Sequence, residues 1–345
     1  MASELTVRPL LEDEFERWAR VVAEAPSGSV YSLPAYLTIL CEATSARFRV
    51  FGVFKGTEIQ GGMAVYEAQS KIGTVASNRL LLFYHSPVIR EYPSQYPSDR
   101  TSRQLPIIQA LIDELDRQPY AHLLMHARHP LTDMRAFQAK GWRVKPNYSY
   151  VVAIEDLKAA YGRIEQNLRR LIERAENNGL TFCDDDDFDS FYHLHEETHR
   201  RKGAPLYLAK ENFRRYVKAL KDANLGKLFH ARLANGKVAA SQLVLTGPHP
   251  VTHTVCAAAD AEFLSLGSTP FLRWKAFQTL SQLGYKGNDL TDAALNDVTR
   301  FKSQLGGDLV TNWVIVKPES RRYLWYLRAA ALASKGRTFQ RRQNG

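Results

Sequence analysis

The sequence contains little cysteine. Its three cysteines, Cys41, Cys183 and Cys256, are spread over 345 residues and form no Cys-x-x-Cys pair. An odd number at this spacing supports neither a disulfide framework nor a thiolate metal site, and it is typical of a reducing compartment. We therefore expect a cytoplasmic protein in which cysteine ligates no metal.

Long hydrophobic runs are also missing. No window approaches the about 18 uncharged apolar residues that a membrane-spanning helix needs, and the best candidate, "LWYLRAAALA" at 324–333, has Arg328 in its middle. The opening "MASELTVRPLLEDEF" has no basic segment followed by an apolar stretch, so we expect no secretory signal. These features predict a chain without a transmembrane segment.

The net charge of +10 is unevenly distributed. Residues 315–345 hold eight basic side chains against Glu319 alone, a net +7, which leaves +3 for the rest of the chain. A basic tail from about residue 319 would attract RNA phosphates, an anionic donor or anionic lipid headgroups, the last giving peripheral membrane contact. A solvated, frayed terminus is the alternative explanation.

The chain predicts the same structural plan twice. Each half reads as a hairpin followed by strand, helix, strand, helix and strand; the hairpins turn at 55–58 and at Asn235-Gly236. This pattern predicts an α+β protein of two domains with mixed sheets flanked by helices, 1–155 and 156–345. The repeat is one of architecture, without repeated residues.

The stretch "HEETH" at 195–199 matches the His-Glu-x-x-His signature of zinc peptidases. The extended form of that signature requires Gly at 202 and His at 205, where this chain has Lys202 and Pro205. A distant ligand such as Glu211 or Glu262 stays open. We interpret the match as coincidental and predict no metal.

Three stretches together resemble one family. They are the basic helix "NLRRLIERAENNGLTF", the hairpin "GKLFHARLANGKVAASQLVL", and "STPFLRWKAFQTLSQLGYKGNDLTDAALNDVTRFKSQLGG". In this order the second half resembles the GNAT-related acyltransferases that include the FemAB aminoacyltransferases and the BioF2-like acetyltransferase domain. "TDMRAFQAKGWRVKPNYSYVVAI" is similar to that family's crossing between domains. The sequence departs from the family pattern at 290–292, where glycines are usual, and at Leu305, which replaces an aromatic residue.

The resemblance implies two tandem GNAT-like domains and assigns a role to Lys302 in "RFKSQLGG". This lysine matches the one that the family places at the donor end of its site, where a cation would neutralise a phosphate or stabilise an oxyanion. Phe301 would pack beneath it. The alternative is a surface lysine on a short helix.

The donor-binding residues that we expect are Gly267, Ser268 and Thr269. They precede Pro270 at a predicted helix start, where free N–H groups and the helix dipole attract an anion. GNAT domains bind pyrophosphate at this junction, and the resemblance implies a related role here. An ordinary helix cap is an equal alternative, and both can hold together.

Two further groups complete the predicted site. Asp289 and Asp292 would orient or deprotonate the amine, although a strand-end or capping role is the alternative for Asp292. Arg201, Lys202 and Arg170 would bind an anionic acceptor, and Arg170 belongs to a stripe that equally suits a solvated helix face.

No Cys-His or Ser-His-Asp arrangement stands out, which suits direct transfer between two positioned substrates. We expect an N-acyltransferase with no tightly bound cofactor that uses aminoacyl-tRNA or acyl-CoA as co-substrate. The acceptor would be an amine, such as a peptidoglycan or other cell-envelope precursor. Two alternatives stay open: an acyl-CoA-dependent N-acetyltransferase of a polysaccharide or small amine, and a non-catalytic pair that binds a nucleotide-linked glycan or RNA.

Overall fold

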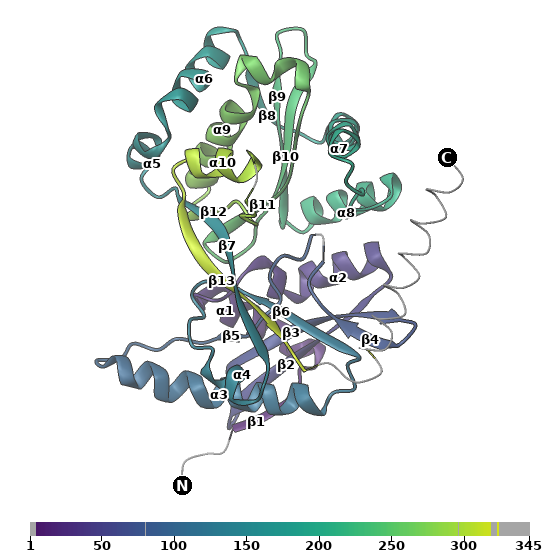
Figure 1. Cartoon of the computed structure of the whole chain (residues 1–345), viewed down its shortest axis with the longest axis vertical. Coiled ribbons are helices and arrows are strands. Elements are labelled where there is room, and N and C mark those ends of the chain that lie inside the picture. The colour runs from purple at the N-terminus through teal and green to yellow at the C-terminus, as the bar shows by residue number, and fades with distance from the viewer. Residues whose placement is uncertain (1–4, 80, 296, 319–322, 324–345) are drawn as a thin grey trace, which may run out of the picture.

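The computed structural model describes residues 5–79, 81–295, 297–318 and 323 (Figure 1). The basic tail predicted from about residue 319 lies outside these residues, apart from Tyr323. In the described part of the chain, no helix combines the length and the apolar character that crossing a membrane requires.

The first half is a three-stranded meander between helices. It begins with a short edge strand, places two helices before the meander, and ends with helix, strand, helix and strand. The elements are β1 (Leu5–Pro9), α1 (Phe15–Glu24), α2 (Pro34–Thr44), β2 (Arg47–Lys55), β3 (Glu58–Ser70), β4 (Gly73–Ala76), β5 (Val88–Ile89), α3 (Pro97–Arg117), β6 (His122–Ala127), α4 (Arg135–Ala139) and β7 (Arg143–Ala153).

The second half repeats this order, so the predicted α+β plan is confirmed. After two linking helices come an edge strand, two helices, a meander, and again helix, strand, helix and strand. The elements are α5 (Leu157–Arg163), α6 (Gln166–Asn177), β8 (Thr181–Asp184), α7 (Phe188–Lys202), α8 (Lys210–Asp222), β9 (Gly226–Arg232), β10 (Val238–Leu245), β11 (Val251–Ala259), α9 (Ser268–Gln282), β12 (Gly287–Asp289), α10 (Asp297–Gln304) and β13 (Asp308–Val316).

The two halves exchange their last strands. β7 of the first half pairs with β12, and β13 of the second half pairs with β6. The exchanged strands also pair with each other, antiparallel, from Asp308↔Val151 to Val316↔Arg143. One continuous sheet therefore runs through the chain, and β7 and β13 cross between its two parts (Figure 1). The boundary near residue 155 stays a prediction, because sheet membership and chain order differ for these strands.

Helices bury the sheet and join the halves. α3 packs over the first meander through an apolar face that includes Ile108 and Leu111, and α9 packs over the second through Phe271 and Phe277. A third core contains residues of α2 and α8 from opposite halves. There the hydroxyl groups of Tyr36 and Tyr216 lie 2.9 Å apart. The halves therefore share buried side chains as well as strands.

Candidate functional site

A break in the sheet of the second half creates a cavity. β11 and β12 pair in parallel only from Val251↔Gly287 to His253↔Asp289. Beyond that point the strands part, and residues 254–257 and 290–292 line a cavity of about 280 Å³. The register of β10 against β11 also shifts here, a bulge of the kind often found beside active sites. Where the strands part, the Thr291 hydroxyl donates a hydrogen bond to the Thr254 carbonyl at 3.0 Å.

Lys302 reaches this cavity from α10. Its Nζ donates hydrogen bonds to the carbonyl oxygens of Thr291 at 2.5 Å and Asp292 at 2.7 Å. Both acceptor residues lie in the left-handed region, with φ of +51° and +31°, which costs about 1 kcal/mol or more for a residue with a side chain. Burial, and then the neighbouring Arg273, lowers the pKa of Lys302 to about 8. The amine is therefore mainly a cation at neutral pH, and it holds a strained turn.

A second cavity of about 400 Å³ continues from the first along the start of α9. Its walls are mostly apolar and include Leu168, Leu272 and Phe301, and Thr269 lies at the helix start. Thr198, Lys202, Ala257, Arg273 and Val298 line both cavities. The two hollows are therefore adjacent parts of one cleft between α7, α9, α10 and β11.

Arg273 is the side chain at this junction that sequence reasoning missed. It is only 7% exposed, and its Nε and Nη1 have no hydrogen-bond partner among the described residues. Burial lowers the pKa of its guanidinium to about 10. In the sequence, the available signal is the spacing: Arg273 lies four residues from both Thr269 and Phe277 and therefore on the same face of the helix.

Other polar atoms lining the cleft also lack partners within the described chain. The Gln242 amide is 1% exposed with both its oxygen and its nitrogen unpartnered. The hydroxyls of Thr198 and Thr269 and Nε2 of His195 are in the same state. Buried polar groups are normally hydrogen-bonded, so a cluster of unsatisfied ones around one cleft indicates a ligand that satisfies them.

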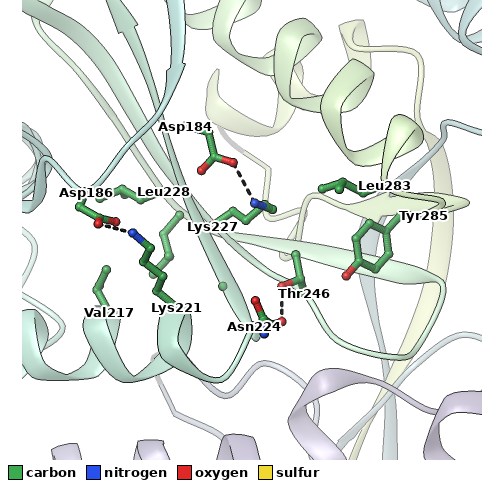
Figure 2. Close-up of a pocket in the computed structure, with 12 residues that line it drawn as sticks. Asp184, Asp186, Val217, Lys221, Asn224, Lys227, Leu228, Thr246, Leu283 and Tyr285 are labelled. Atoms are coloured by element: carbon green, nitrogen blue, oxygen red, sulfur yellow. Dashed lines mark hydrogen bonds and ion pairs between the residues drawn. The ribbon is translucent and has the colours of Figure 1, made fainter.

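A third cavity, of about 470 Å³, differs in this respect (Figure 2). Its charged side chains pair with one another: Lys227 with Asp184 at 2.8 Å, and Lys221 with Asp186. The Thr246 hydroxyl donates to the carbonyl of Asn224 at 3.2 Å. In Figure 2 dashed lines join the two members of each pair. Because these charged side chains already pair within the protein, they do not need a ligand to neutralise them, in contrast to the unpartnered groups of the cleft.

The "HEETH" helix contributes two imidazoles to the smaller cavity. Nδ1 of His199 donates to the carbonyl oxygen of Pro205 at 2.8 Å, which leaves Nε2 as the acceptor in the neutral ring. Burial lowers the pKa of His195 to about 3, so that ring is neutral. In the described chain no group of three or more His, Cys, Asp or Glu residues is placed to hold a metal ion.

The predicted catalytic residues occupy different environments. Lys302 and Asp292 line the smaller cavity. Asp289 is fully buried beside it and is not among the lining residues. Its carboxylate accepts hydrogen bonds from the Tyr84 hydroxyl at 2.7 Å and the Thr291 amide at 2.8 Å, and burial raises its pKa. Through these hydrogen bonds Asp289 ties the first half to the turn at 291, and its catalytic role stays a prediction.

The predicted donor residues also divide. Thr269 and Phe301 line the larger cavity. Ser268 is fully buried, and its hydroxyl donates to the Phe263 carbonyl at 3.1 Å. Gly267 has φ +82°, and a Cβ there would lie 2.2 Å from the Leu171 carbonyl oxygen. Glycine is therefore required by close packing on α6.

The predicted acceptor residues are divided between the cleft and the surface. Arg201 lines the larger cavity and Lys202 lines both. Arg170 is exposed on α6 and is not among the residues that line either cavity. The structure therefore brings two of these three cations to the cleft.

Comparison with known proteins supports an acyltransferase. Residues 162–303 match the model of the acetyltransferase (GNAT) domain family. A search of curated protein sequences gave no match.

Solved structures share the tandem fold at low sequence identity. FemX has a TM-score of 0.71 at 12% identity, covering 90% of this chain and 96% of its own. The C-terminal domain of a protein described as a lysylphosphatidylglycerol synthetase from Agrobacterium fabrum has a TM-score of 0.59 at 13% identity, covering 93% and 96%. A tandem GNAT protein of clavulanic acid biosynthesis has a TM-score of 0.53 at 12% identity, covering 92% and 100%.

Proposed function

We propose that this chain, whose residues 162–303 match the acetyltransferase (GNAT) domain family and whose tandem fold is shared with FemX, is an acyltransferase that moves an acyl group from an anionic carrier to an amine held in the cleft beside Lys302. The main support for this proposal is that polar atoms without hydrogen-bond partners surround the place where β11 and β12 part. Gln242, Thr269 and Arg273 all line the cleft and all lack partners within the described residues.

We infer that the donor is a coenzyme A thioester. Its pantetheine arm is a narrow chain with two amides, which suits an apolar channel that contains the unsatisfied Gln242 amide. Its phosphates would lie at the start of α9, where the first N–H groups have no partner in the helix and the dipole favours an anion. Aminoacyl-tRNA, which the FemAB resemblance implies, is the alternative donor.

In the transfer step the amine nitrogen attacks the acyl carbon in the smaller cavity. A C–N bond forms, the C–S bond of the thioester breaks, and the thiolate leaves. The Lys302 ammonium would stabilise the oxyanion, a contribution of about 2.7–4 kcal/mol for one well-placed donor in other enzymes. The amine proton would pass to Nε2 of His199, because the ring's other nitrogen is engaged with Pro205. Asp292, which also lines this cavity, is the alternative acceptor of the amine proton.

The acceptor that we favour is an amine of a cell-envelope precursor. Support comes from the FemAB-like resemblance and from the fold shared with a protein described as a lysylphosphatidylglycerol synthetase. A polysaccharide or small amine is the alternative. Peripheral membrane contact through the basic tail stays a prediction, since that tail lies outside the described residues.

A donor screen tests the proposal. Binding of acetyl-CoA and of charged tRNA is measured at several salt concentrations, and each donor is then offered amines in a transfer assay. We expect acetyl-CoA to bind with a shallow salt dependence, and Gln242→Leu to weaken binding more than the exposed control Gln69→Leu. Tight tRNA binding with a steep salt dependence would instead favour the aminoacyl donor. Failure of both donors to bind would refute acyl transfer in this cleft.

A further inference from the structure

The positive charge of the Arg273 guanidinium is buried and has no partner of opposite charge in the described chain. Its guanidinium is buried, its Nε and Nη1 have no hydrogen-bond partner, and no ion pair joins it to a carboxylate of the described chain. The same cavity is lined by the cations Lys202 and Lys302 and by Asp292, which forms no ion pair with Arg273, and Arg273 lowers the pKa of Lys302. An unpaired buried charge is strongly unfavourable, and it becomes favourable when an anion binds.

The position of Arg273 separates this anion from the donor's phosphates. Thr269 lies at the start of α9, and Arg273 follows four residues later, about 6 Å along the helix axis. Arg273 also lines the smaller cavity together with Lys302, and in that cavity the amine would attack. The anion that binds Arg273 would therefore belong to the acceptor substrate.

We propose that Arg273 binds a carboxylate of the acceptor, so that the acceptor is an amino acid or peptide with a free carboxylate near its reacting amino group. This inference rests on the proposed function. One unpaired cation calls for about one negative charge, and a guanidinium offers a carboxylate two parallel N–H donors. The unpartnered Thr198 hydroxyl and the neutral His195 ring line the same cavity and offer further polar contacts.

Binding without any donor tests the inference. Titration calorimetry would compare L-alanine with L-alaninamide, L-lysine with L-lysinamide, and L-alanyl-L-alanine with its amide. We expect each carboxylate to bind the wild type about tenfold or more tightly than its amide, the preference of one charge-assisted pair. Arg273→Met should abolish this preference. Arg273→Lys should keep only part of it, because lysine lacks the planar fork.

Thermal unfolding of the ligand-free protein gives a second readout. Because the guanidinium is buried without a partner, Arg273→Met should leave the Tm unchanged or raise it. Addition of a carboxylate ligand should raise the Tm of the wild type and not that of the variant. The control is Arg214→Met, which removes an exposed arginine that pairs with Asp189 at 2.7 Å.

Several results would overturn the inference. These are equal binding of acids and amides, failure of every carboxylate to bind, tighter binding of phosphoethanolamine than of the amino acids, and a Tm of ligand-free Arg273→Met well below wild type. Such a lower Tm would show that the guanidinium stabilises the ligand-free protein through a partner within the protein. Carboxylate preference without transfer from any donor would refute the proposed function alone. Transfer that accepts acids and amides equally would refute only this inference.

Discussion

Replacement of Lys302 by methionine should separate catalysis from stability. Methionine retains a long apolar side chain, and it removes both the charge and the hydrogen bonds to the carbonyls of Thr291 and Asp292. The lysine pKa of about 8, against 10.5 for an ordinary lysine, corresponds to about 3 kcal/mol of unfavourable charge burial at neutral pH. Because the amine faces an open cleft, solvent reduces this figure to about 1–3 kcal/mol.

The two effects on stability oppose each other. Methionine relieves the buried charge, and it leaves two carbonyls without a donor at about 1–3 kcal/mol for each that stays unsatisfied. Solvent in the cleft can serve the exposed Asp292 more readily than the buried Thr291. We therefore expect the free energy of unfolding at pH 7 to change by about 1 kcal/mol or less, while the transfer rate falls about a hundredfold or more.

The pH dependence gives an independent signature. Between pH 8 and 10.5 the unfolded lysine binds a proton that the folded lysine has lost, so the free energy of unfolding should rise with pH in this window. Relative to Lys302→Met, the wild-type transfer rate should fall above pH 8, because the Lys302 cation is lost. Neither Lys302 effect should remain in Lys302→Met.

The assays are urea unfolding at pH 7 and pH 9.5, and thiol release from acetyl-CoA with an amine found in the donor screen. Lys275→Met serves as the matched control, since Lys275 lies on α9 and pairs with Glu176 at 2.8 Å outside the cleft. A rate within a few-fold of wild type in Lys302→Met would refute the assigned role. A rate that rises through pH 8 in the wild type and not in Lys302→Met would show that the neutral Lys302 amine acts as a base.

Three other substitutions test the structural reasoning. Gly267→Ala should lower the free energy of unfolding by about 2–4 kcal/mol, because it adds a clash with α6 to an unfavourable φ; Gly284→Ala, with φ +89° and open space, should lose only about 1 kcal/mol in the same urea titration. Tyr84→Phe should destabilise by about 1–3 kcal/mol at neutral pH in urea titrations, because Asp289 loses a buried donor; an unchanged midpoint would contradict that role. His199→Asn should lower kcat about a hundredfold with little change in donor affinity, and an unaltered kcat would move the base to another group.

Much of the fold could be predicted from residues that act locally. The Asn235-Gly236 turn forms a hairpin between β9 and β10, and Gly284 follows the end of α9, whereas Pro270 is the third residue of that helix, which begins at Ser268. Lys302 was found by its place in "RFKSQLGG", and the structure brings it to the cleft. These features depend on a few neighbours along the chain, so one sequence shows them.

The site as a whole could not be predicted in this way. Arg273 resembles any helical arginine in the sequence, and Asp289 resembles any carboxylate at the end of a strand. Their burial follows from contacts with residues far away in the chain, such as the 2.7 Å hydrogen bond from Tyr84, 205 residues away, to Asp289. Sequence patterns report the surroundings of a residue along the chain and not those across the sheet.

The sequence by itself determined a repeated α+β plan, an acyltransferase-like second half and one lysine, Lys302, that lies in the cleft, because turn residues, helix caps and short motifs act over a few positions. The tertiary structure alone decided that β7 and β13 change places, that β11 and β12 part after His253, and that Arg273 is left without an anion. Those outcomes depend on which distant strands share hydrogen bonds, and hydrogen bonding between strands is a property of the folded chain.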